Sequence, residues 1–124
     1  MSNTKGKGDG MNIVILSRGP GNYTTKRLRE VAIARGHEVR VIDYTKCYMT
    51  IEKGSPVVYY QGEKIEKVDA IIPRIAQSYT KYGTAVVRQF EMCGVFTTAS
   101  SMAINRSRDK LRSYQLLAKY RSEE

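Results

Sequence analysis

The sequence predicts an α/β domain in which helices flank a mostly parallel sheet, the doubly wound arrangement. Two observations carry this prediction. Apolar runs at residues 13–16 and 70–72 have the composition of strands that are buried on both faces of a parallel sheet. A Gly-Pro-Gly turn at residues 19–21 and a segment with helical periodicity follow the first run, as in the opening unit of such a domain. Ligands of doubly wound domains bind beside the loop after the first strand.

The first helix is predicted over residues 22–35. Its inward face has the i, i+3, i+4, i+7 spacing of an amphipathic helix and comprises Leu28, Val31, Ala32 and Arg35. Asn22 is a preferred N-cap residue, and Gly36 is typical of the position that ends a helix. Residues 38–43 then alternate between apolar and polar, which predicts a strand nearer the edge of the sheet.

The middle of the chain predicts a small antiparallel hairpin beside the parallel sheet. Residues 57–60 and 63–65 have strand composition, and Gly62 between them supplies the positive φ that a tight turn needs.

A second helix is predicted over residues 79–94. Tyr82, Val86 and Phe90 recur every four residues and indicate core packing, and Gly94 ends the helix. A last short strand at 95–98 and one or two helical turns at 99–104 complete the predicted domain.

The domain is expected to occupy residues 11–104. Residues 1–10 have no large apolar side chain after Met1 and are interpreted as a disordered tail or a cloning remnant. Residues 105–124 are expected to form the start of a linking helix toward an absent domain. The apolar stripe of this helix would need to be covered by that domain or by a second copy of the chain.

Composition excludes several classes of protein. The chain has 124 residues, of which 41% are hydrophobic and 27% charged, as in an ordinary globular domain. No apolar run approaches the roughly 20 residues of a membrane span, and no secretory signal is recognisable, so a cytoplasmic location is expected. Cys47, Cys93 and His37 have no zinc-site spacing; both thiols are interpreted as small buried hydrophobes and His37 as a turn residue.

Two arginines are the candidate binding residues. Arg18 and Arg74 each end a predicted parallel strand, and the carboxyl ends of parallel strands lie at one edge of a sheet. Together they could hold a carboxylate or phosphate group bidentately. The alternative is a pair of rim arginines without a ligand.

A dinucleotide site is disfavoured. Asp43 follows Gly21 by 22 residues, close to the distance of a ribose-binding acid. However, the turn lacks the third glycine of G-x-G-x-x-G, and Pro20 has no N–H to donate to a phosphate.

The net charge of +9 is unusual for a chain of this length. The tail contributes Lys5, Lys7 and Asp9, a net charge of +1, which leaves +8 on the rest of the chain. Such a surface attracts nucleic acid, phosphate or an acidic peptide, or serves only solubility. A stand-alone module that binds RNA or the ribosome surface is therefore the alternative function. Direct nucleic-acid binding is disfavoured because no RNP-like aromatic motif or KH-type loop is present.

Several blocks of sequence resemble a known family. The chain is similar to the N-terminal domain of the RimK-type ATP-grasp ligases from Met11 to about Lys119. The blocks that carry the resemblance are IVILSR at 13, KRLRE at 26, IPRI at 72, YGTA at 82, RQFEM at 88 and RDKLRS at 108. The Gly19-Pro20-Gly21 turn departs from the composition expected of the family at that loop.

The resemblance implies a Rossmann-like pre-ATP-grasp domain of a larger ligase. The implied reaction is ATP-dependent addition of glutamate to the C-terminus of a ribosomal protein, through an acylphosphate and with release of ADP. ATP and magnesium or manganese would be held mainly by absent domains, so we expect no catalytic or metal-binding residue in this chain and no activity of the chain alone. By resemblance, Lys110 corresponds to a lysine that reaches the nucleotide.

The resemblance also implies the partners: the acidic C-terminus of the acceptor protein and free glutamate. An acidic tail would be attracted to a domain at +8. Arg18 and Arg74 are therefore expected to bind the acidic acceptor or the incoming glutamate.

Overall fold

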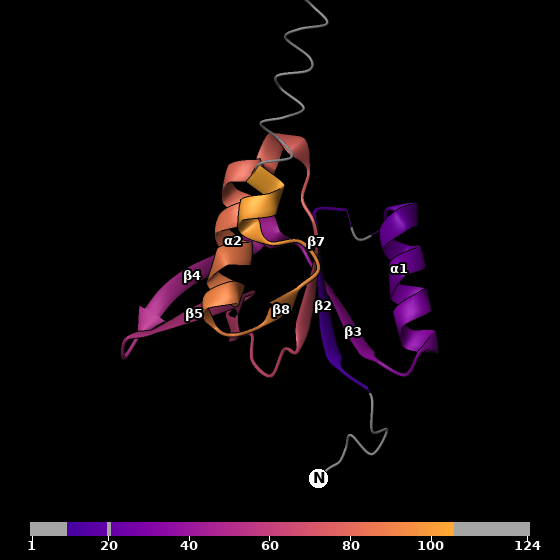
Figure 1. Ribbon diagram of the computed structural model, residues 1–124, viewed down its shortest axis with the longest axis horizontal. Helices are drawn as coiled ribbons and strands as arrows, with labels where there is room; N and C mark the ends of the chain where they lie inside the picture. The colour runs from indigo at the N-terminus through magenta and orange to yellow at the C-terminus, as the bar shows by residue number, and fades with distance from the viewer. Residues whose placement is uncertain (1–9, 20, 106–124) are drawn as a thin grey trace, which may run out of the picture.

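The computed structural model describes residues 10–19 and 21–105 (Figure 1). The tail at 1–9, Pro20 and residues 106–124 lie outside the described residues, and with them Lys110 and nearly all of the expected linking helix.

A four-stranded parallel sheet forms the centre of the fold, as predicted. Its strands are β2 (Asn12–Ser17), β3 (Glu38–Ile42), β7 (Ala70–Arg74) and β8 (Phe96–Thr97), in the order β3-β2-β7-β8. All three pairings are parallel, and β3 lies at the edge, as its alternating sequence predicts. The β2–β7 register pairs Ile15 with Ile72 and Ser17 with Arg74, so the two central strands end level with each other.

One helix covers each face of this sheet. Figure 1 shows α1 (Tyr23–Ala34) on one side and α2 (Thr80–Met92) on the other. Ile13 of β2 packs with Ala32 on the α1 side, whereas Val14 and Leu16 pack with α2 residues such as Phe90. The prediction that the first apolar run is buried on both faces is thus confirmed.

The predicted helix ends are also confirmed. Asn22 caps α1 by accepting a hydrogen bond from the backbone N–H of Thr24 at 2.9 Å, and Gly36 follows the helix with a φ of +92°. The predicted apolar face of α1 is only partly buried, because Val31 remains exposed while Thr25 and Ala32 are buried.

A second, antiparallel sheet packs on the outer side of α2. It contains β4 (Cys47–Glu52), β5 (Ser55–Tyr60) and β6 (Glu63–Lys64), in that order. The β5–β6 hairpin was predicted, whereas β4 was not. Buried Gln89 of α2 ties the sheet to the helix, since its Nε2 donates to the carbonyls of Thr50 at 2.9 Å and Val57 at 3.2 Å.

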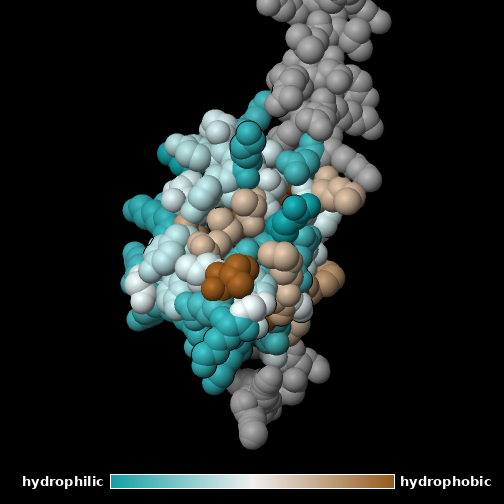
Figure 2. Space-filling model, turned by 90° about the vertical axis from the view of Figure 1, so that its left-hand side faces the viewer, coloured by the Kyte–Doolittle hydropathy of each residue, from teal (hydrophilic) through white to brown (hydrophobic). Residues whose placement is uncertain are grey.

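The outer side of the molecule, where β4 and β5 lie beside α2, is mostly hydrophilic (Figure 2). Apolar side chains gather there in a small area. Ile51 of β4, with 63% of its surface exposed, and Tyr48 are among the exposed large apolar residues of the chain. A small exposed apolar area of this kind is ordinary on a globular surface.

Pro73 sits inside β7 without disturbing the β2–β7 pairing. The carbonyl of Ile71 accepts a hydrogen bond from the N–H of Thr98, so the backbone polar groups of Ile71 face β8. Alternate residues of a strand face the same neighbour, so those of Pro73 face that side too. β8 ends at Thr97, which pairs with Ile71, so no strand among the described residues lies opposite Pro73 on that side. The missing N–H of the proline therefore breaks no ladder hydrogen bond.

Replacing Gly83 with alanine should destabilise the chain. A Cβ at this helix position would lie 2.4 Å from Cγ2 of buried Ile75, whose side chain would have to move. Overpacking costs about 1–3 kcal/mol, against about 1 kcal/mol that alanine gains over glycine in a helix. We expect a lower urea midpoint for Gly83→Ala. Gly21→Ala, where an added Cβ meets nothing within 4 Å, is the control; an equal or raised midpoint for Gly83→Ala would contradict this packing.

Candidate functional site

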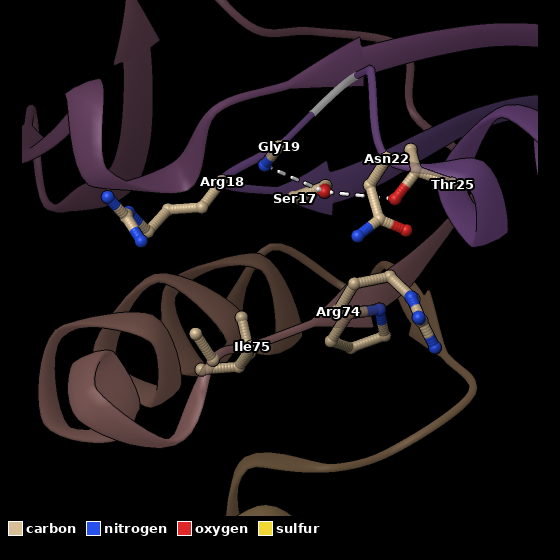
Figure 3. A pocket seen from close by; sticks show the side chains of 9 residues that line it. Ser17, Arg18, Gly19, Asn22, Thr25, Arg74 and Ile75 are labelled. Carbon is tan, nitrogen blue, oxygen red and sulfur yellow. Dashed lines mark hydrogen bonds between the residues drawn. The ribbon is translucent and has the colours of Figure 1, made fainter.

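A hollow of about 710 Å³ lies at the carboxyl ends of β2 and β7 (Figure 3). Residues 17–19, Asn22 and Thr25 line it on one side and residues 73–76 on the other. This is the edge of the sheet at which doubly wound domains bind ligands.

Hydrogen bonds within the 17–25 loop build one wall of the hollow. The hydroxyl of buried Ser17 is within hydrogen-bond distance, 3.0 Å, of the hydroxyl of buried Thr25. The Ser17 hydroxyl also accepts a hydrogen bond from the N–H of Gly19 at 3.2 Å. The N–H of Asn22 donates to the carbonyl of Gly19 at 2.9 Å, while the Asn22 side chain caps Thr24. These polar groups hold the loop against α1, and the N–H groups of Gly19, Asn22 and Thr24 already have partners.

The structure places Arg18 and Arg74 at this same edge, as expected. Both line the hollow: Arg74 is the last residue of β7, and Arg18 directly follows β2, whose last residue, Ser17, pairs with Arg74. Figure 3 shows their side chains extending in opposite directions. Two guanidiniums that point apart are better placed to bind two separate carboxylates than to bind one carboxylate or phosphate group together, which is the arrangement that the sequence predicts.

The charged side chains that line this edge are both arginines. No Asp or Glu lines the hollow, and neither Arg18 nor Arg74 makes an ion pair within the described part of the chain. Both α1 and α2 begin at the carboxyl ends of strands, and neither has an acidic residue in its first turn. Helix N-termini carry partial positive charge, so the helices add to the field of the arginines.

A buried tyrosine that sequence reasoning missed supports the second wall. Tyr44, in the 3₁₀ helix η1 (Tyr44–Lys46), is fully buried, and its hydroxyl accepts from the N–H of Ala76 at 2.9 Å. Tyr79, at the end of the 3₁₀ helix η2 (Gln77–Tyr79), was also missed. The guanidinium carbon of Arg18 lies over its ring, 4.5 Å from the centroid. No local sequence signal marks either tyrosine, because both contacts join segments far apart in the chain.

Asp43 and His37 serve local structure. The Asp43 carboxylate accepts from the N–H of Thr45 at 3.0 Å and from its hydroxyl at 2.6 Å, and so caps η1. His37 accepts from the N–H of Met11 through Nδ1 at 3.0 Å. Neither residue lines the hollow.

The two cysteines differ. Cys47 is buried, and burial, with a smaller contribution from the charge of Asp43, raises the pKa of its thiol to about 12. The interpretation of Cys93 as a buried hydrophobe is wrong: it follows α2 directly and is exposed, and its thiol donates to the carbonyl of Pro56 in β5 at 3.2 Å. Among residues 10–19 and 21–105, no group of three or more His, Cys, Asp or Glu is placed to hold a metal ion. No helix in the same residues is long and apolar enough to cross a membrane.

The fold and the site together define a class: a Rossmann-like domain with a basic ligand edge. A family model described as the RimK PreATP-grasp domain matches residues 11–104, so the chain belongs to this family.

Named relatives agree with the family. The chain is 57% identical over 110 residues to a probable alpha-L-glutamate ligase of Aeromonas salmonicida (strain A449), covering 89% of this chain and 37% of the relative. It is 59% identical over 109 residues to a protein of the same name from Teredinibacter turnerae (strain ATCC 39867 / T7901), covering 88% and 36%. The chain thus spans little more than a third of these relatives.

Solved structures agree on the fold. The ATP-grasp ligase PsnB complexed with precursor peptide PsnA2 and AMPPNP matches with a TM-score of 0.54 at 18% identity, over 73% of this chain and 37% of that one. PsnB complexed with a phosphomimetic variant of the minimal precursor, Mg and ADP matches with a TM-score of 0.51 at 20% identity, over 81% and 39%.

Thiol reactivity should separate the two cysteines. Desolvation raises the pKa of the Cys93 thiol, but this thiol is exposed to a reagent, whereas the buried Cys47 thiol, with a pKa of about 12, has almost no thiolate at about pH 8. We expect Ellman's reagent to modify one thiol per folded chain rapidly, and Cys93→Ser to remove that phase. Both thiols should react in denaturant. Rapid modification of Cys47 in the folded chain would contradict its burial.

Proposed function

We propose that this chain is the N-terminal, substrate-side domain of an ATP-dependent carboxylate–amine ligase. The proposed enzyme adds glutamate to the C-terminus of an acceptor protein, by resemblance a ribosomal protein, and releases ADP. The observation that carries the proposal is the basic, acid-free hollow at the carboxyl edge of a RimK pre-ATP-grasp domain. The relatives' name, alpha-L-glutamate ligase, supports the glutamate substrate.

The two separate guanidiniums favour a ligand with two carboxylates. Free glutamate and an acidic C-terminal residue both carry an α-carboxylate and a side-chain carboxylate. Arginine binds such groups through paired N–H donors in a fixed planar fork. In this role Arg18 and Arg74 bind and orient the substrate, and the helix N-termini lower the cost of its negative charge.

The nucleotide and its metal belong to the remainder of the proposed ligase. ATP, with magnesium or manganese, activates a carboxylate as an acylphosphate when bound. The described residues offer no acidic cluster for the metal, and three N–H groups of the 17–25 loop, those of Gly19, Asn22 and Thr24, are already paired within the loop. Lys110, outside the described residues, is the one nucleotide contact we propose for this chain.

The proposed organisation follows the sequence. Residues 11–104 form the pre-ATP-grasp domain, 105–124 begin the linking helix, and 1–10 are a tail. The proposed location is the cytoplasm, and a second copy or the remaining domains would cover the linking helix. RNA binding stays the disfavoured alternative, since exposed basic residues such as Arg29, Arg40 and Arg88 lie on separate elements.

Removing the two guanidiniums should weaken substrate binding. In the complete ligase, Arg18→Gln and Arg74→Gln should each raise KM for glutamate or for the acceptor peptide about tenfold or more, the value of a charge-assisted hydrogen bond. The effect should shrink at higher salt because screening weakens attraction to a charged substrate.

Arg29→Gln is the matched control. Arg29 is an exposed arginine of α1 that does not line the hollow. Equal KM values for all three variants and the wild type, for both substrates, would overturn the proposed site.

The chain alone should bind ATP weakly. Lys110 would be one contact among many that lie outside the chain, so calorimetry with ATP and magnesium should detect no binding at micromolar concentrations of ligand. Micromolar affinity of the 124-residue chain would mean that the nucleotide site lies largely within it.

A further inference from the structure

Tyr79 occupies a position that helix capping does not explain. It is the N-cap residue of α2, where Ser, Thr, Asn and Asp are favoured because their side chains accept a backbone N–H. Tyr79 makes no such hydrogen bond. With 37% of its surface exposed, it is not a core residue either. Its ring instead lies under the guanidinium of Arg18, 4.5 Å from the guanidinium carbon.

The backbone that carries Tyr79 is fixed from two sides. Ala76 donates its N–H to the hydroxyl of buried Tyr44 at 2.9 Å, and its carbonyl accepts the N–H of Tyr79 at 2.9 Å. The hydroxyl of Thr80 donates to the carbonyl of Gln77 at 2.8 Å and closes the next turn. The segment that forms one wall of the hollow thus also holds the ring beside the end of β2.

Arg18 and Arg74 differ in how they are held. Within the described part of the chain, the Tyr79 ring is the one side chain that contacts the Arg18 guanidinium, whereas exposed Arg74 has neither a ring contact nor an ion pair there. A ring under the face of a guanidinium leaves the N–H donors, which lie in the guanidinium plane, free for a carboxylate. A long side chain that is already ordered loses less conformational entropy on binding.

We propose that Tyr79 is a positioning residue that holds the Arg18 guanidinium at the hollow, ready for a substrate carboxylate, while Arg74 adjusts to the ligand. This inference rests on the proposed function. It assigns the two arginines different roles: the Arg18 side chain is ordered before the substrate binds, and the Arg74 side chain becomes ordered when the substrate binds.

Kinetics of the complete ligase test the proposal through the ring. Tyr79→Leu should raise KM for the substrate that Arg18 binds by about two- to fivefold, the range of an exposed cation–π contact, with kcat unchanged. Tyr79→Phe keeps the ring face and should behave as the wild type. Tyr23→Leu is the matched control: Tyr23 is the first residue of α1, 79% exposed, and no arginine among residues 10–19 and 21–105 lies over its ring.

A double variant shows whether Tyr79 acts through Arg18. If it does, Arg18→Gln with Tyr79→Leu should have the KM of Arg18→Gln alone. An equal further rise of KM in the Arg18→Gln background would overturn the proposal, as would a Tyr79→Phe variant as impaired as Tyr79→Leu.

The order of Arg18 can be measured without substrate. Nitrogen-15 relaxation of the Arg18 Nε–H group, assigned with Arg18→Gln, should report restricted motion in the wild type and Tyr79→Phe, and fast motion in Tyr79→Leu. Unchanged relaxation in Tyr79→Leu overturns the positioning role even if Arg18 binds substrate. Unchanged KM in Arg18→Gln would instead overturn the binding role of Arg18, and the relaxation would still decide whether the ring holds it.

Discussion

Burial of β2 on both of its faces is the constraint on which the rest of the structure depends. A strand of this kind needs a helix on each side, and parallel neighbours to satisfy its backbone groups. The helices therefore start at the edge where the strands end. Arg18, Arg74 and the N-terminus of α1 are brought to one hollow by that topology alone. The chemistry of the edge is thus a consequence of how the core is covered.

Local patterns were sufficient to predict the central sheet and both helices. Apolar runs fall on β2 and β7, and Asn22, Gly36 and Gly94 mark helix ends that the structure confirms. These sequence patterns reflect interactions between residues that lie close together in the chain. The common edge of Arg18 and Arg74 could be predicted for the same reason, because it follows from parallel pairing.

The features that could not be predicted depend on contacts between distant segments. β4 mixes polar and apolar residues, and its place is set by pairing with β5 and by the amide of Gln89. Tyr44 is buried because the segment after β7 crosses it, and Tyr79 meets Arg18 only once β2 and η2 are assembled. Cys93 is exposed while its thiol donates to the carbonyl of Pro56, 37 residues earlier in the chain, which its composition does not reveal.

The loop after β2 favours a carboxylate over a phosphate for a specific reason. A phosphate-binding turn presents several unpaired N–H groups to the ligand. Here the N–H of Gly19 is donated to Ser17, that of Asn22 to Gly19 and that of Thr24 to Asn22, and a proline at position 20 has none. Three N–H groups of this loop are therefore taken, and the side chains of Arg18 and Arg74 carry the full positive charges of the edge. The planar guanidinium of arginine suits the geometry of a carboxylate well. If the Tyr79 ring holds the Arg18 guanidinium in place, the site gains the rigid donors that a phosphate-binding loop would supply from its backbone.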